Sequence, residues 1–168
     1  MKHRTNGLLL LATALLWTAP ALSHDFESGS IRIDHPWSRA TPPGAPVAGG
    51  YLKIENKGPD ADRLVSIKSE IAARAELHES IVKDGVASMR PLDGALEVPA
   101  GQSVELGSGG IHIMFMKPSA TLKKGDKFKA TLVFEKAGPI EVEFVVQSMG
   151  SRAPEESSDH GGDHGAGQ

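Results

Sequence analysis

Apolar and polar residues alternate along the chain in short runs, which Gly, Pro, Asn and Asp separate about every ten residues. Alternation with a period of two predicts β-strands, because successive side chains of a strand point to opposite faces. After residue 23 no stretch keeps a helical period, apart from a turn near residues 70–73. The pattern predicts an all-β antiparallel sandwich or barrel. The expected strands are 30–34, 47–56, 63–69, 74–82, 86–91, 95–98, 104–106, 111–116, 128–134 and 140–146.

One turn fixes the register of a hairpin. Asp84-Gly85 lies between two alternating segments and is typical of a type I′ turn, which needs positive φ at both central positions. With these two residues as the loop, Ser80 pairs with Met89. His78 and Met89 then lie on one face as diagonal neighbours, with Cα atoms about 7 to 8 Å apart.

The expected strand over residues 111–116 has two chemically different faces. One face is apolar and suits a core: Ile111, Ile113 and Phe115. The other carries an imidazole and two thioethers: His112, Met114 and Met116. The chain has no cysteine, so imidazoles and thioethers are the soft metal ligands that it offers.

Two strand segments thus each place a His and a Met on one face, and the candidate ligands are His78, Met89, His112 and Met114. This donor set favours Cu(I), because thioethers bind Zn(II), Mg(II) and Ca(II) poorly. Without a thiolate, a blue copper site is excluded. Taken singly, each Met is more typical of core packing and each His of a surface role, so the prediction depends on the joint arrangement. Met116 shares the face but is expected to pack.

Three further residues are expected to have ordinary structural roles. Glu79 follows His78, but strand alternation points it to the opposite face, as a solvated charge. Trp37 and Arg39 are expected in a loop segment, as a packed ring and a surface cation.

Residues 1–23 have the pattern of a secretory signal peptide. Lys2 and Arg4 precede an apolar run over 7–17, and a small-x-small sequence ends at Ser23, after which cleavage is expected, with Ala21 as the alternative. A membrane anchor is disfavoured, because a spanning helix needs about 20 apolar residues. We therefore expect a periplasmic protein with no membrane span after cleavage.

Charge and cysteine content narrow the possible partners. The formal charge of −3 becomes −5 once the two cations of the signal peptide are removed. Nucleic acid is an unsuitable partner for such a chain, because phosphate binding needs a clustered positive surface. An exported domain without cysteine forms no disulfide, so its stability has to come from packing.

Residues 24–148 form one domain of ordinary size, and residues 149–168 are rich in Gly, Ser, Asp, Glu and His, which predicts a disordered tail. An Asp-His unit repeats there, with His160 and His164 as a secondary metal site for Cu(II) or Zn(II). An ordinary solvated terminus is the alternative. Our hypothesis is that the tail collects Cu(II) while the folded site holds Cu(I). A mature N-terminal His24 would add an amine and an imidazole for Cu(II).

The ligand spacing, His78-x10-Met89-x22-His112-Ile113-Met114, resembles the signature of the periplasmic copper chaperone PCu(A)C family, with a second gap one residue longer. The resemblance spans roughly residues 30 to 147. Other segments that carry it are Pro36-Trp37-Ser38-Arg39-Ala40, Pro42-Pro43-Gly44-Ala45, Tyr51 with Asn56-Lys57-Gly58, Asp62-Arg63-Leu64-Val65, Leu77-His78-Glu79, Met89-Arg90-Pro91 and Leu122-Lys123-Lys124-Gly125-Asp126.

The resemblance implies a cupredoxin-like Greek-key β-sandwich that holds Cu(I) in an exposed site near a hairpin tip. It also implies delivery to an acceptor protein, the dinuclear copper centre of a cytochrome c oxidase subunit. Whether a second copper carrier works alongside it stays open.

Two other classes compete with a copper chaperone. An enzyme is disfavoured, because the chain lacks a convincing Ser-His-Asp order, a His-Glu-x-x-His motif and a phosphate-binding glycine loop. An exported β-sandwich binding module would make the His and Met residues incidental. A zinc or copper storage protein without a delivery role is a milder variant, and zinc would gain little from Met89 or Met114.

Overall fold

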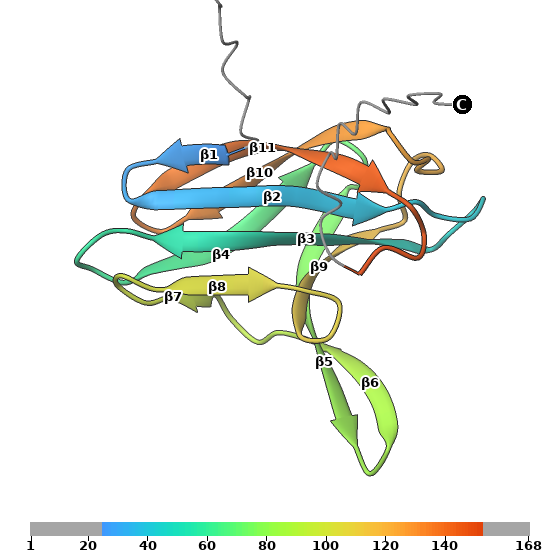
Figure 1. Cartoon of the computed structure of the whole chain (residues 1–168), viewed down its shortest axis with the longest axis horizontal. Helices are drawn as coiled ribbons and strands as arrows, with labels where there is room; N and C mark the ends of the chain where they lie inside the picture. Colours follow the sequence, from blue (N-terminus) through green and yellow to red (C-terminus); the bar gives the residue numbers. More distant parts are fainter. Residues whose placement is uncertain (1–24, 153–168) are drawn as a thin grey trace, which may run out of the picture.

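The computed structural model describes residues 25–152, and within this range it contains strands and loops (Figure 1). No helix in this part of the chain could cross a membrane. The predicted signal peptide (residues 1–23), His24 and residues 153–168 of the predicted tail lie outside the described residues. Residues 149–152, which were assigned to the same disordered tail, are described, and Ser151 is buried and bonded to Arg39. The strands are β1 (Asp25–Ser28), β2 (Ile31–Arg39), β3 (Val47–Asn56), β4 (Asp62–Ser69), β5 (Arg74–Lys83), β6 (Val86–Pro91), β7 (Leu96–Val98), β8 (Ser103–Leu106), β9 (Ile111–Met116), β10 (Lys127–Phe134) and β11 (Gly138–Gln147).

All the strands join one continuous sheet in the order β6-β5-β9-β3-β2-β11-β10-β4-β7, while β1 pairs with β2 and β8 with β3. The sheet curls over, so that β4 and β10 lie behind β2 and β3 as the second layer of a sandwich (Figure 1). This confirms the predicted cupredoxin-like all-β sandwich. One pair departs from the antiparallel rule, because β11 runs parallel to β2.

The expected strands are present with small changes in length, but the segment 35–39 was wrongly expected to be a loop. It belongs to β2, which contains Pro36 at a bulge, where the pairing with β3 shifts between Asp34 and Trp37. His35 has a φ of 47° there. Proline donates no hydrogen bond, so a bulge is where a strand tolerates it. β1 was not predicted.

The apolar face of β9 packs into the centre of the core. Phe115 is fully buried, with edge-to-face contacts to Phe128 and Phe144 at centroid distances of 5.2 and 5.5 Å. Gly50 on the neighbouring strand β3 makes this packing possible, since a Cβ there would lie 2.6 Å from the Phe115 ring. The core therefore fixes the position of β9, and with it the direction of the opposite face.

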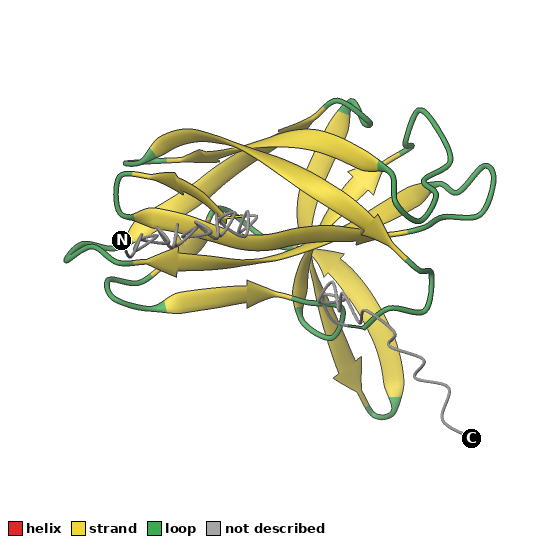
Figure 2. Cartoon of the chain, turned by 45° about the horizontal axis from the view of Figure 1, so that its top comes forward, coloured by secondary structure: helices red, strands yellow, loops and turns green. Residues whose placement is uncertain are grey.

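The β5–β6 hairpin projects from the body of the sandwich, as two views show (Figures 1 and 2). Its turn has φ of 52° at Asp84 and 77° at Gly85, in agreement with the predicted type I′ turn. The predicted register is also confirmed, with Ser80 opposite Met89. All six residues of β6 are exposed, so the sandwich supports this arm only through β5.

Asp62, at the start of β4, is buried and ties the β10–β11 turn to the sheet. Its carboxylate accepts backbone N–H groups of Arg63, Lys136 and Ala137 at 2.7 to 2.9 Å. Burial alone would raise the pKa of Asp62, but the three donors together hold it below its ordinary value.

We predict that Asp62→Asn lowers the free energy of unfolding by about 2 kcal/mol at pH 7, because it removes the charge that these donors stabilise. A lowered folded-state pKa gives stability that is complete above the unfolded pKa of about 3.9 and is lost as the pH falls through the folded value. Urea unfolding should therefore show a gap between the wild type and the variant that narrows below about pH 4. The exposed Asp60→Asn is the control; a gap that is unchanged at pH 3 would contradict the assignment.

Candidate metal centre

The four predicted ligands lie on three adjacent strands, β6, β5 and β9. His78 of β5 is directly opposite His112 of β9, and Met89 of β6 is opposite Ser80, two residues beyond His78. Met114 lies two residues beyond His112. Cross-strand partners and residues two apart share a face, so the structure brings all four side chains to one face of the sheet.

The two histidine rings are close enough to share one metal ion. Their centroids are 6.4 Å apart, and the ring planes are inclined by 45°. A metal ion lies about 2 Å from an imidazole nitrogen, and so about 3 Å from the ring centre. Two rings on opposite sides of one ion therefore have centres about 6 Å apart, close to the observed spacing.

Exposure increases across the site from β9 to β6. His112 is only 2% exposed, Met114 is half-buried, and the side chain of His78 is 13% exposed. Met89 is 62% exposed on the projecting hairpin. The expected exposed site is therefore open on the hairpin side and closed at His112.

A backbone carbonyl orients the His112 ring. Nδ1 lies 3.0 Å from the carbonyl oxygen of Gly110, which also accepts the Ser80 N–H at 3.1 Å. A carbonyl oxygen can only accept, so His112 Nδ1 carries the proton and donates it. This tautomer leaves the Nε2 lone pair available to a metal ion, as is usual for metal-binding histidines.

Glu76 belongs to this face, although the sequence analysis did not select it. It lies directly opposite Met114, and its Oε2 is 3.2 Å from His78 Nε2. The alternation that placed Glu79 on the other face would have placed Glu76 beside His78. Glu79 is indeed turned away and pairs with Arg90 at 2.9 Å.

An aromatic group adjoins the buried end of the site. The Tyr51 ring lies 6.4 Å from the His112 ring and 4.5 Å from Trp37, which is buried as predicted. Arg39 was expected to be a surface cation. Instead its guanidinium carbon lies 5.2 Å from the Tyr51 ring centre, and its Nε donates to the carbonyl oxygen of Ser151 at 2.6 Å. This bond ties the end of the described chain to β2.

The chemistry of the donor set fits copper better than zinc. Residues 25–152 contain no cluster of three or more His, Asp or Glu that could hold a metal ion. Ser80 Oγ, which lies on the same face, is the one buried side-chain N or O atom of the described residues without a hydrogen-bond partner. Met116 lies opposite Arg74, two cross-strand pairs beyond Met114, and is half-buried.

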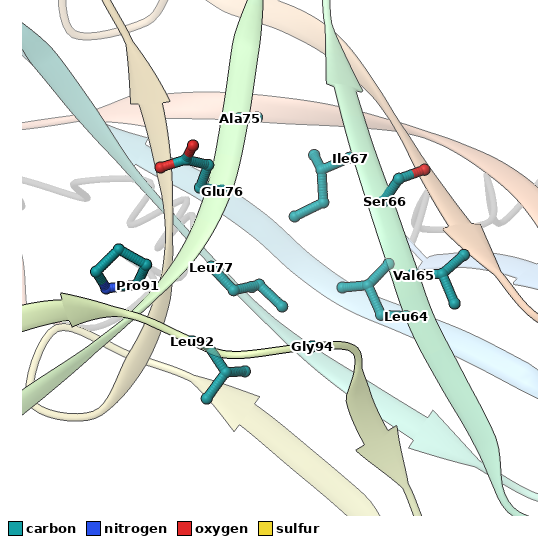
Figure 3. A pocket seen from close by; sticks show the side chains of 10 residues that line it. All are labelled: Leu64, Val65, Ser66, Ile67, Ala75, Glu76, Leu77, Pro91, Leu92 and Gly94. Carbon is teal, nitrogen blue, oxygen red and sulfur yellow. The ribbon is translucent and has the colours of Figure 1, made fainter.

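A pocket lies between β5 and β4 (Figure 3). Leu64, Leu77 and Leu92 line it, with Leu77 pointing into it, and Glu76 contributes to its wall. The lining contains no imidazole and no thioether, and Glu76 is the residue that it shares with the face of the candidate metal centre.

Comparison with known proteins gives consistent results. The profile of the LpqE-like family, described as "Putative lipoprotein LpqE-like", matches residues 31–146. The chain is 30% identical over 125 residues to "Putative lipoprotein Lxx21020" of Leifsonia xyli subsp. xyli (strain CTCB07), a match that covers 74% of each chain.

Solved structures show the same fold. The "Copper-bound PCuAC domain from PmoF2" is 30% identical with a TM-score of 0.64, and the match covers 74% of this chain and 98% of that domain. The "Apo PCuAC domain from PmoF1" is 28% identical with a TM-score of 0.63, covering 74% and 99%. The family match and these shared folds together show that the chain belongs to the LpqE-like family, of the PCu(A)C type.

Proposed function

We propose that this protein is a periplasmic copper chaperone, which binds Cu(I) through His78, Met89, His112 and Met114 and delivers it to another protein. The observation that carries the proposal is the convergence of two imidazoles and two thioethers on one face of β6, β5 and β9. Copper is the cargo of such a protein, which performs no catalysis.

The donor chemistry supports a carrier. Thioethers and neutral imidazoles suit Cu(I), and without a thiolate the metal stays exchangeable. The exposure of Met89 beside the buried His112 leaves one side of the site open. An acceptor's ligands can approach from that side while His112 still holds the ion.

The relatives support copper handling and export. One structural relative is a copper-bound PCuAC domain, and the relative from Leifsonia xyli is named a lipoprotein. Together with the signal-peptide pattern of residues 1–23, this favours the periplasm. Delivery to the dinuclear copper centre of cytochrome c oxidase follows from the family resemblance and completes the proposal.

The tail has a second role in this proposal, the capture of Cu(II) by His160 and His164. Both residues lie outside the described range. Arg39 Nε donates to the carbonyl oxygen of Ser151, just before these residues.

Two functions without delivery are the alternatives: a plain exported binding module and a zinc or copper storage protein. Zinc is disfavoured, because it would gain little from the thioethers of Met89 and Met114.

We expect anaerobic competition titration to give one tightly bound Cu(I) per chain on protein truncated after Arg152. His112→Ala and Met114→Ala should each lower the Cu(I) affinity by about 100-fold or more, since losing a ligand should cost more than the 10–100-fold typical of a supporting residue. Met149→Ala, at a methionine that is 58% exposed outside the site, is the matched control. Weak binding that neither ligand variant changes would favour the binding module.

For the tail, we expect truncation after Arg152 to leave the Cu(I) affinity unchanged and to reduce the number of Cu(II) ions bound. Full-length protein with His160→Ala and His164→Ala should reproduce this loss, which would assign it to the imidazoles and not to chain length. Equilibrium dialysis against Cu(II) measures the stoichiometry. Equal Cu(II) uptake by all three proteins would exclude tail capture.

For delivery, we expect Cu(I)-loaded protein to transfer its ion to the soluble copper-binding domain of a cytochrome c oxidase subunit. Copper content of the two proteins after their separation measures the transfer. Copper that stays with this protein in the presence of the metal-free acceptor would instead indicate storage.

A further inference from the structure

We propose that Glu76 is a positioning residue for copper binding: it fixes the tautomer of His78 so that His78 binds copper through Nδ1, while His112 binds through Nε2. This inference rests on the proposed copper site and adds to it a residue outside the four ligands, together with the identity of the two coordinating nitrogens.

The first step is the position of the carboxylate. Glu76 and His78 are two residues apart on β5, so their side chains share a face, and Oε2 of Glu76 lies 3.2 Å from Nε2 of His78. The other oxygen, Oε1, lies 3.1 Å from Nε of Arg74. Both oxygens of Glu76 therefore have a partner, and the carboxylate is held beside the imidazole.

The second step is the direction of the hydrogen bond. An ionised carboxylate only accepts, so the proton of this bond belongs to His78 Nε2. A neutral imidazole carries one proton, and its other nitrogen keeps the lone pair. The lone pair that His78 can offer to a metal ion is therefore on Nδ1.

The third step is the comparison with His112, whose Nδ1 is bonded to the Gly110 carbonyl. Two different acceptors thus select opposite nitrogens as the protonated one in two rings whose centroids are 6.4 Å apart. His78 therefore offers Nδ1 to a metal ion, and His112 offers Nε2. The side chain of Glu76 on β5 determines the first, and the backbone carbonyl of Gly110, just before β9, determines the second.

The fourth step is that the Glu76 carboxylate is not itself a copper ligand. Glu76 lies directly opposite Met114, on the face that carries the four candidate ligands. Its bonds to Arg74 and His78 hold it in a supporting position. The copper ligands then remain neutral, which favours Cu(I) over Cu(II) or Zn(II).

The tautomer can be tested on metal-free protein at pH 8. Long-range ¹H–¹⁵N correlation spectra distinguish the two tautomers of each ring. We expect His78 to be Nε2-protonated in the wild type and to become a mixture of tautomers in Glu76→Ala. Glu76→Gln should retain the Nε2-protonated form, because the amide oxygen still accepts. Glu79→Ala removes an equal charge from the opposite face of β5 and should leave His78 unchanged.

Cu(I) affinity gives the second measurement. Glu76→Ala should weaken binding by about 10- to 100-fold, the usual range for a residue that orients a metal ligand, while Glu76→Gln should stay within a few-fold of the wild type. On loading with Cu(I), the ¹⁵N resonance of His78 that shifts most should be Nδ1. Glu76 is half-buried, and urea unfolding curves would verify that each variant is folded.

Several results would overturn the proposal. These are an Nδ1-protonated His78 in the wild type, a tautomer unaffected by Glu76→Ala, or equal losses of Cu(I) affinity in Glu76→Ala and Glu76→Gln. The tautomer is measured without copper, so its outcome is independent of the copper site itself. Failure of the wild type to bind Cu(I) would reject the proposed function and leave the tautomer assignment standing.

Discussion

The pairing of β5 with β9 is the constraint on which the candidate centre depends. This antiparallel register places His78 opposite His112 and Glu76 opposite Met114. A shift by one residue would turn every side chain of one strand to the other face and would separate the histidines. The register is held from the core side, because Ile113 and Phe115 of β9 are fully buried. Packing on one face of β9 therefore determines the metal chemistry that is possible on the other.

Much of this arrangement could be predicted from local patterns. Alternation and the Asp84-Gly85 turn have short-range causes, so the β5–β6 hairpin, its register and both faces of β9 were predictable. The pairing of β5 with β9 joins segments about thirty residues apart, and no local signal specifies it. Alternation therefore predicted two pairs of His and Met on separate strand segments. The resemblance to a known family indicated that the two pairs form one site.

The differences between prediction and structure have particular causes. The segment 35–39 was expected to be a loop, yet a bulge with a positive φ at His35 lets β2 continue through Pro36. The parallel pairing of β11 with β2 depends on the path of the whole chain, which strand patterns do not encode. Glu76 was not predicted, because a carboxylate is not a soft metal ligand. Its importance comes from a hydrogen bond to a ligand, and that contact was visible only in three dimensions.

The projecting hairpin separates metal binding from the stability of the fold. β6 is exposed along its whole length and forms its ladder with β5 alone, so substitutions there leave the sandwich core intact. Met89 is therefore carried by a part of the molecule that contributes little to global stability, while His112 is carried by the part that contributes most. In the proposed chaperone, sequence changes in this arm would adjust how tightly and how fast copper is exchanged without destabilising the sandwich. The proposed function thus leaves the arm free to adapt to different copper acceptors.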